Sequence, residues 1–463
     1  MAKKNKSSPV VESDPGGGAR RLEGRDRRLV VPLAAHAGMP ERRRDPLAII
    51  ADEDSTRLPD LVPIRHGRMA VSPFAFYRAT AGVMASDLSA TPTTDLTLQL
   101  CGDAHIMNFG VFRDPDRRLV FDLNDFDETL VGPFEWDVKR FATSLTLVAR
   151  NNGFKGKEVR RITLDGVGAY RNAIDDATRV GPLALNYRRT EVEGILESLK
   201  DPAMRKAAEK VSRQAMHHDT IAAVGKLTEV VDGQRRIVEH RPLIVRIDDE
   251  VAVEGPAGVA EFFDAAAQSL PLHQRYLLSR YSIVDVARKI VGVGSVGTRC
   301  LVVLLESDDG HPLFMQFKEA GASVLEPYCA PSPFAEHGER VVQGQRLMQT
   351  TGDIFLGWAR RNRGDGVRDF YFRQLWDGKA SLDPSTLRQN GLSLYAALCA
   401  RTLGFAHART RNVEQIAGYL GDDTTFDEAV SVFADGYADI VEGDFEQHAA
   451  AIATGRIHAV RDI

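Results

Sequence analysis

The chain has 463 residues, of which 43% are hydrophobic and 27% are charged, and its formal net charge is −5. This length and composition are typical of a folded protein with a core large enough for two lobes or domains. No stretch approaches the roughly eighteen consecutive apolar residues of a membrane span, and the N-terminal residues lack the apolar segment of a secretory signal. The four cysteines lie far apart without C-x-x-C spacing, which argues against a disulfide framework and a zinc site. We therefore expect a cytoplasmic protein with reduced thiols and no membrane span.

Residues 1–45 are rich in Lys, Arg, Gly, Ser and Pro and predict a disordered tail. Acidic residues among the arginines make binding to nucleic acid unlikely. Residues 73–88, which follow Ser72 as a helix start, predict one helix. Arg78 on this helix is either a phosphate contact or an ordinary ion-pair residue.

Residues 101–137 carry the strongest chemical signal, CGDAHIMNFGVFRDPDRRLVFDLNDFDETLVGPFEWD. Phosphoryl transfer from a nucleotide needs a base for the acceptor hydroxyl, and an amide and a carboxylate oxygen to hold Mg²⁺ on the phosphates. Asp103, Asn108 and Asp125 supply these groups in that order. The alternative is a β-hairpin whose acidic residues are solvated in its turns. The run VFDLNDFD argues against that alternative, because it places acids and amides in a segment that otherwise alternates like a buried strand.

This segment resembles the catalytic and metal loops of the protein-kinase-like superfamily, particularly the aminoglycoside phosphotransferase and choline kinase branch. The pattern there is roughly H-G-D-x-H-x-x-N, then D-F-x-x-A, then G-P-x-x-x-D. The matching residues here are Gly102, Asp103, His105, Asn108, Asp125, Phe126, Gly132, Pro133 and Asp137. Cys101 departs from the pattern, since the family often has His there.

The resemblance implies that Asp103 and His105 are catalytic and that Asn108 and Asp125 bind the metal. Asp122 competes with Asp125, but only Asp125 has the expected spacing to Gly132. Asp127 is a candidate second carboxylate.

Residues 150–285 carry no motif with a clear chemistry. Helical patterns occur at 159–177, 191–210 and 259–279, and residues 230–237 predict a hairpin. We expect this region to be an insertion that joins the lobes and shapes the acceptor site.

Residues 291–320, VGVGSVGTRCLVVLLESDDGHPLFMQFKEA, contain the G-x-G-x-x-G of Gly292, Gly294 and Gly297. A dinucleotide-binding fingerprint would open a helix, but an apolar β-branched run follows these glycines. Strand, glycine loop, strand, turn and strand is the arrangement of the nucleotide-covering lobe of a kinase. Lys318, at the end of the third strand, then contacts the phosphates, although a solvated strand-end lysine is the simpler alternative.

A kinase-type lysine needs an acidic partner on the following helix, which we predict over residues 336–350. Glu339 is the preferred partner, while Glu336 and Gln343 lie on or near the same face. Strands at 354–358 and 370–375, separated by a basic turn at 360–366, would complete a five-stranded sheet. The following residues, 376–381, resemble the hinge that binds adenine.

The glycine loop and Lys318 follow the catalytic block, whereas they precede it in ordinary kinases. The amphipathic helix predicted at 392–411 resembles the helix that leads into H-G-D, yet no such loop follows it. The predicted fold is therefore α+β, a protein-kinase-like two-lobe fold in circular permutation. The predicted domains are a disordered tail (1–45), the first part of the large catalytic lobe (46–150), a mainly helical insertion or lobe connection (151–280), the small nucleotide-binding lobe (281–380) and the helical completion of the large lobe (381–463).

Residues from about 45 to 463 also closely resemble the bacterial family of domain of unknown function 2252, on the motifs GDAH-x-x-NFG, NDFDE, DVARKIVGVGSVGT and FADGYAD. The predicted function is an ATP- and Mg²⁺-dependent phosphotransferase that acts on a hydroxyl-bearing acceptor, which the sequence does not name. Two alternatives stay open: a module that binds nucleotide without transfer, and a metal-dependent phosphoesterase built on Asp103, His105 and Asp125.

Overall fold

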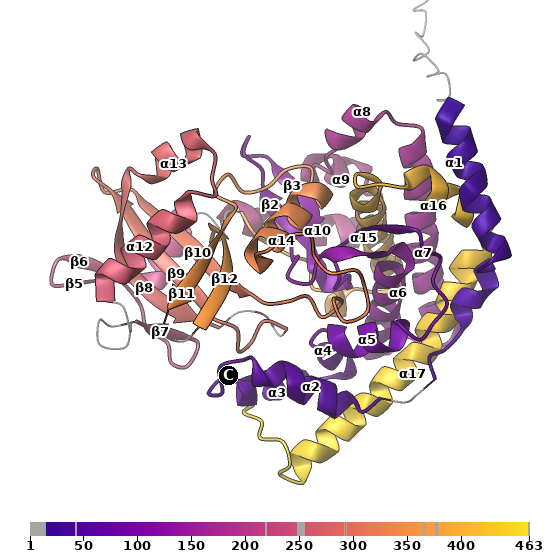
Figure 1. Cartoon of the computed structure of the whole chain (residues 1–463), viewed down its shortest axis with the longest axis horizontal. Coiled ribbons are helices and arrows are strands. Elements are labelled where there is room, and N and C mark those ends of the chain that lie inside the picture. The colour runs from indigo at the N-terminus through magenta and orange to yellow at the C-terminus, as the bar shows by residue number, and fades with distance from the viewer. Residues whose placement is uncertain are drawn as a thin grey trace, which may run out of the picture.

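The computed structural model describes residues 15–41, 44–217, 220–247, 255–290, 292, 294–363, 366–375 and 378–461. The fold is mixed α+β, with seventeen α-helices and a six-stranded antiparallel sheet within these ranges. Figure 1 shows the large sheet at one end of the molecule and a body of helices at the other. In the described part of the chain, no helix has the length and apolar character needed to cross a membrane.

The helical body is built around α6, α7, α15, α16 and α17. Their bounds are Phe134–Asn151, Lys157–Thr178, Gln389–Ala408, Val413–Leu420 and Thr425–Ala453. Helix α6 is buried along almost its whole length, and α7, α15 and α17 share its apolar core. The helices predicted at 159–177 and 392–411 are confirmed as α7 and α15.

The N-terminal residues 15–41 are not the disordered tail that their composition predicted. They form α1 (Pro15–Asp26) and the short 3₁₀ turns Arg27–Leu29 and Leu33–Ala37. Helix α1 runs along the outside of the body (Figure 1), and Arg21 forms a 2.6 Å ion pair with Asp175 of α7. Gly418 of α16 lies so close to the Arg21 backbone that any side chain there would collide with it. Close backbone packing on α16, which composition does not reveal, therefore orders this segment.

The chain then forms α2 (Pro46–Ser55), α3 (Val62–Met69), α4 (Pro73–Tyr77) and α5 (Ala81–Leu88). The single helix predicted at 73–88 is thus two helices. Thr80 has the non-helical backbone angles φ −123° and ψ 46°, which end the first helix and begin the second.

Four short strands lie within or directly before residues 101–137. They are β1 (Thr97–Leu100), β2 (Phe109–Arg113), β3 (Leu119–Leu123) and β4 (Leu130–Pro133). The strands β1 and β4 pair with each other, and β2 pairs with β3. The 3₁₀ turn Ile106–Asn108 lies between β1 and β2.

The large sheet has the strand order β11-β12-β10-β9-β8-β7. In chain order its strands are β7 (Ile244–Arg246), β8 (Tyr281–Lys289), β9 (Cys300–Ser307), β10 (Pro312–Ala320), β11 (Gly357–Arg363) and β12 (Gly366–Gln374). Helix α14 (His337–Met348) connects β10 to β11. Five strands in the predicted succession are confirmed, and β7 is an added sixth strand at the edge. Strand β11 starts later than predicted because Asp353 accepts a hydrogen bond from the Phe355 amide and holds residues 353–356 in a turn.

Alternation along the strands gives the sheet two different faces. On one face Leu313, Met315 and Phe317 of β10 share a core with α12 (Gly255–Ala267) and α13 (Leu272–Leu278). The opposite face carries Phe314, Gln316 and Lys318. Phe314 packs there with Leu227 at the end of α11 (Thr220–Leu227) and with Ile237 of β6. Lys318 therefore projects from an otherwise buried sheet face at the end of its strand.

Residues 150–285 do not form a separate insertion. Helix α7 belongs to the helical body, whereas α11 to α13 pack on the large sheet and β7 is one of its strands. The pattern at 191–210 is split into α9 (Val192–Ser198) and α10 (Pro202–His217), and the one at 259–279 is interrupted by Pro271. The short α8 (Pro182–Asn186) precedes them. The predicted hairpin is confirmed as β5 (Thr228–Val231) and β6 (Gln234–Ile237).

Candidate active site

The loop after β1 is held by Asp137, which lies in the first turn of α6. Its carboxylate accepts hydrogen bonds from the Cys101 amide (2.8 Å) and the Gly102 amide (3.1 Å). Gly102 has φ +84°, and a side chain at this position would collide with the carbonyl oxygen of Glu128. The loop thus needs both the glycine and the carboxylate that the sequence pattern singled out.

Asp137 is in turn supported by α15 and α7. The Asp137 Oδ2 atom lies 3.1 Å from His407 Nε2, and His407 Nδ1 lies 2.9 Å from the Tyr170 hydroxyl. All three side chains are buried. The contacts from Tyr170 through His407 to Asp137 hold the 101–103 loop in place. They also join the helix predicted at 392–411 to residues 101–137.

Asp103 is paired with an arginine that sequence reasoning missed. Its Oδ1 accepts a 2.6 Å hydrogen bond from Arg140 Nε, and the Arg140 guanidinium stacks 4.4 Å from the centre of the Tyr77 ring. Burial raises the pKa of Asp103 to about 6, although Arg140 opposes this shift. Arg140 lies one helical turn after Asp137 on α6, so spacing on that helix was the available signal.

His105 lies beside this carboxylate, with its Nε2 atom 3.8 Å from Asp103 Oδ2. Burial holds the pKa of His105 well below its ordinary value, and the nearby charges of Arg78 and Arg140 act in the same direction. His105 is consequently neutral near pH 7 and adds no charge beside the Asp103 carboxylate.

Asn108 joins the two acidic loops. Its Nδ2 donates to the carbonyl oxygens of Asp103 (3.0 Å) and Asp125 (3.2 Å). With the amide nitrogen used in this way, the Oδ1 oxygen is available for a cation. The Asp125 side chain is 42% exposed, which makes it the most accessible carboxylate of this group. Asp122 is buried and accepts a hydrogen bond from the Leu123 amide, so it is less accessible than Asp125.

Lys318 brings the small lobe to this centre, 191 residues along the chain from Asp127. Its Nζ lies 2.7 Å from Asp127 Oδ2 and 4.0 Å from Asp125 Oδ1. Tyr371, the cross-strand neighbour of Lys318, donates a 2.6 Å hydrogen bond to Asp127 Oδ1. Burial alone would raise the pKa of Asp127, but Lys318 and Tyr371 lower it to about 2. The structure therefore unites the two motifs through Asp127.

The ion-pair partners of Lys318 are Asp127 and Asp125, and the predicted partner Glu339 is not among them. The residue of α14 that reaches the site is Arg340, next to Glu339. Arg340 donates to the carbonyl oxygens of Thr129 (2.6 Å) and Asp127 (2.8 Å). Gly344, one turn later on α14, approaches Thr129 so closely that no side chain fits. The face of α14 with Arg340 and Gly344 is thus turned inward, and Glu339 lies about 100° away from Arg340 around the helix.

The glycine loop connects β8 to β9 as a turn and lies against the helical body. Arg57 donates to the carbonyl oxygens of Gly294 (2.8 Å) and Val296 (2.6 Å), and Arg68 donates to that of Gly292. Gly297 has φ +95°, and a Cβ there would lie 2.9 Å from Arg57 Cβ. Ser295 donates a 3.2 Å hydrogen bond to Asp127 Oδ2, so the loop directly adjoins the Lys318 pair.

The donor set fits magnesium bound together with a phosphate better than a metal held by protein alone. Among the described residues, no three His, Cys, Asp or Glu side chains are grouped so that they could hold a metal ion. Magnesium is commonly held by one or two carboxylates with substrate phosphates. Asp125, together with the Oδ1 oxygen of Asn108, would supply the protein oxygens of such a site.

Besides Arg140, the sequence did not point to two cations, Arg373 and Lys379, and one hydroxyl, that of Tyr371, near this centre. Arg373 and Tyr371 lie on β12, where alternation places both on the Lys318 face. Lys379 follows β12 beyond residues 376–377, and part of the predicted adenine hinge therefore lies outside the described residues.

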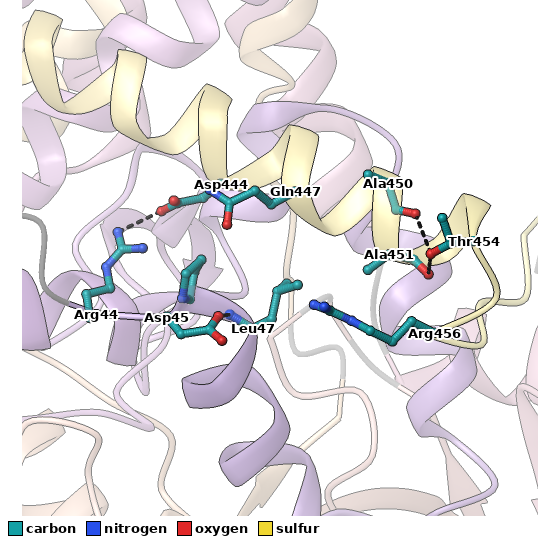
Figure 2. Close-up of a pocket in the computed structure, with 10 residues that line it drawn as sticks. Arg44, Asp45, Leu47, Asp444, Gln447, Ala450, Ala451, Thr454 and Arg456 are labelled. Atoms are coloured by element: carbon teal, nitrogen blue, oxygen red, sulfur yellow. Dashed lines mark hydrogen bonds and ion pairs between the residues drawn. The ribbon is translucent and has the colours of Figure 1, made fainter.

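The wider hollows of the molecule lie elsewhere. One, of about 570 Å³, is lined by α2 and the end of α17, where Arg44 forms a 2.6 Å ion pair with Asp444 (Figure 2). Another, of about 950 Å³, is lined mainly by α7, α15 and the start of α17. Neither is lined by a residue of the Asp103–Lys318 centre, so size alone does not locate the chemistry.

Comparison with known protein families gives one match, over residues 57–451, to the family described as "Uncharacterized protein conserved in bacteria (DUF2252)". Searches of curated proteins and of solved structures gave no significant match. The matched range contains the catalytic block, the glycine loop and Lys318, and it covers most of the 463 residues. The chain therefore belongs to the DUF2252 family.

Proposed function

We propose that this protein is a kinase-like phosphotransferase that uses Mg²⁺ and ATP. The observation that carries the proposal is the meeting of Lys318 with Asp125 and Asp127, from segments far apart in the chain. A metal–phosphate complex needs negative groups for the metal and a positive group for the phosphates. The two carboxylates with the Asn108 amide would serve the metal, and the Lys318 ammonium would serve the phosphates.

The arrangement of the small lobe supports the proposal. The glycine loop lies between two antiparallel strands, Lys318 lies on the next strand, and α14 precedes the last two strands. This is the succession that the resemblance to kinases implies. Backbone N–H groups of such a loop can approach phosphate oxygens because glycines carry no side chain there.

A circular permutation would explain the chain order. The segment after α15 lies beside β1, since Asn412 Nδ2 donates to the Thr97 carbonyl oxygen (2.7 Å) and Thr410 Oγ1 accepts from the Gln99 amide (3.4 Å). The helix that would lead into the catalytic loop thus ends next to the strand that carries this loop, although the two are about 300 residues apart.

In the proposed reaction Asp103 accepts the proton of the acceptor hydroxyl while His105 stays neutral beside it. Asn108 and Asp125 hold Mg²⁺, which neutralises charge on the phosphates when it is bound. Lys318 and the glycine loop bind phosphate oxygens. Arg140 orients Asp103 through its 2.6 Å hydrogen bond. Its positive charge also favours the ionised form of Asp103, against the effect of burial.

One observation favours a second candidate, a module that binds nucleotide without transferring phosphate. The hydrogen bond from Arg140 uses one oxygen of the proposed base and lowers its basicity. Only the second carboxylate oxygen of Asp103 is then left for an acceptor.

Thermal unfolding with and without Mg-ATP tests nucleotide binding. Saturation at one hundred times Kd stabilises a folded protein by about 2.7 kcal/mol, which gives a measurable rise in Tm. The rise should require Mg²⁺ and should shrink in Asp125→Ala. The matched control is Asp116→Ala, an exposed carboxylate between β2 and β3. The absence of any shift with ATP or GTP, with Mg²⁺ or Mn²⁺ present, would exclude both candidates.

Phosphate transfer then separates the two candidates. Asp103→Asn should keep Mg-ATP binding, while transfer falls by a factor of roughly 10² or more, as is usual for loss of a general base. Mass spectrometry of the protein with Mg-ATP and cell metabolites would detect added phosphate. If nucleotide binds and no phosphate is transferred, the binding module is the correct interpretation.

A further inference from the structure

A small polar cavity lies next to the Asp125–Lys318 centre. It has a volume of about 50 Å³, and the described residues that line it include three cationic side chains, Arg113, Arg373 and Lys379, and one carboxylate, Asp353. Most of the remaining lining residues are amides, among them Asn124 and Gln345 on opposite sides of the lobe boundary. The cavity thus offers hydrogen-bond donors and an excess of positive charge.

The cavity is connected to the site by Arg373. This residue lies two positions after Tyr371 on the same face of β12, and its Nη1 donates to the Asn124 carbonyl oxygen (3.4 Å). The Asn124 amide donates in turn to the carbonyl oxygen of Asn108 (3.1 Å). Arg373 and Asn124 therefore line the cavity and also adjoin Tyr371 and Asn108 of the Asp125–Lys318 centre.

Of the cations that line the cavity, Lys379 carries its charge at an energetic cost, whereas the pKa of Arg373 is raised because Tyr371, Asp125, Asp127 and Asp353 outweigh the effect of burial. Burial lowers the pKa of Lys379 to about 7. The charges of Arg373 and Lys318 add to that effect, and those of Asp125 and Asp127 oppose it. An anion between Lys379 and Arg373 would relieve this repulsion. Charge-assisted hydrogen bonds to a phosphate are among the strong polar contacts that proteins make.

We propose that this cavity binds a phosphoryl oxyanion beside the phosphate that Lys318 would hold. A buried water needs roughly 10–15 Å³, so the cavity takes a few waters or one tetrahedral oxyanion and is too small for a nucleobase. The oxyanion is either inorganic phosphate or one group of a polyphosphate chain. The inference rests on the proposed function only if the oxyanion is one group of a polyphosphate chain.

Calorimetric titration with inorganic phosphate and with tripolyphosphate, in the absence of divalent metal, tests the cavity. The full-length protein should bind at least one of the two anions. Arg373→Gln and Lys379→Gln should each weaken that binding by roughly tenfold or more, since each removes a charge-assisted contact. The control Arg280→Gln changes an exposed arginine of the same lobe and should bind like the unmodified protein.

The two sources give different outcomes. Similar affinities for phosphate and tripolyphosphate, with and without Mg²⁺, would identify free phosphate. A tripolyphosphate preference that appears when Mg²⁺ is added and disappears in Lys318→Met would identify a chain spanning both positions. Asp125→Ala should retain anion binding because it removes only negative charge, even if it abolishes every effect of Mg-ATP. Failure of the proposed function is thereby separate from failure of this inference.

The proposal is overturned if neither anion binds, or if both cavity variants bind as tightly as the unmodified protein. If Arg373→Gln does not fold, Lys379→Gln decides the question alone.

Discussion

The ion pair between Lys318 and Asp127 should stabilise the contact between the two lobes by several kilocalories per mole. Its Nζ–Oδ2 distance is 2.7 Å, and the Lys318 side chain is 5% exposed. Coulomb's law at an effective dielectric constant of about 20 gives roughly 6 kcal/mol at that distance. Desolvation of both charges offsets part of this energy, so we expect a net coupling of about 2–4 kcal/mol.

A double-mutant cycle measures that coupling. Lys318→Met should lower the free energy of unfolding by roughly 2–4 kcal/mol, because it leaves the Asp127 carboxylate, which is 29% exposed, without its cationic partner. Asp127→Asn should cost at least as much, because it leaves the buried Lys318 ammonium without its nearest counter-charge and keeps only one of the two oxygens to which Tyr371 and Ser295 donate. The double variant should lose less than the sum of the two single losses.

Urea denaturation followed by tryptophan fluorescence is a suitable assay. Trp136 lies in the helical body and Trp358 in the sheet, so both lobes are monitored. The exposed pair of Arg118 and Glu191 serves as control, and Arg118→Met with Glu191→Gln should show no resolvable coupling. Additive losses for Lys318→Met and Asp127→Asn would refute the reasoning, because they would mean that the two charges do not interact in the folded protein.

Three further predictions follow from single groups. Transfer activity should rise with pH through about 6 as Asp103 ionises, and Asp103→Asn should abolish that rise. Gly297→Ala should destabilise the protein by about 1–3 kcal/mol, because φ is +95° and Arg57 occupies the Cβ position, whereas Gly194→Ala, with open space around it, should not. Burial lowers the pKa of His36 to about 3, so the unfolded state binds a proton first as the pH falls below 6.5. Stability should therefore decrease by up to about 2.7 kcal/mol between pH 6.5 and 4.5, and His36→Gln should remove this contribution in urea titrations at both pH values.

The sequence predicted the strands of the small lobe well because their signal is local. Alternation and turn residues define β9 and β10, and the same alternation places Lys318 and Phe317 on opposite faces. Local signals likewise predicted the strands and glycine turns of residues 101–137, where Gly102 and Asp137 hold one loop.

Long-range partners were harder to predict. The choice of Glu339 depended on the rotation of α14, which is set by the close approach of Gly344 to Thr129 rather than by any periodicity within the helix. The order in residues 15–41 likewise depends on α16, almost four hundred residues away, which composition cannot indicate. Charge pairs such as Arg140 with Asp103 are found only once the faces of two elements are known.

The Lys318–Asp127 pair also constrains how a phosphate would enter the proposed site. Lys318 is almost fully buried, so a phosphate oxygen reaches its ammonium group only if Asp127 gives up one of its contacts. Tyr371 and Ser295 can keep the displaced carboxylate hydrogen-bonded, while Mg²⁺ on Asp125 would offset the added negative charge. Phosphate without metal would have to break the same ion pair uncompensated, which is a physical reason to expect metal-dependent nucleotide binding at Lys318 alongside metal-independent anion binding at Arg373 and Lys379.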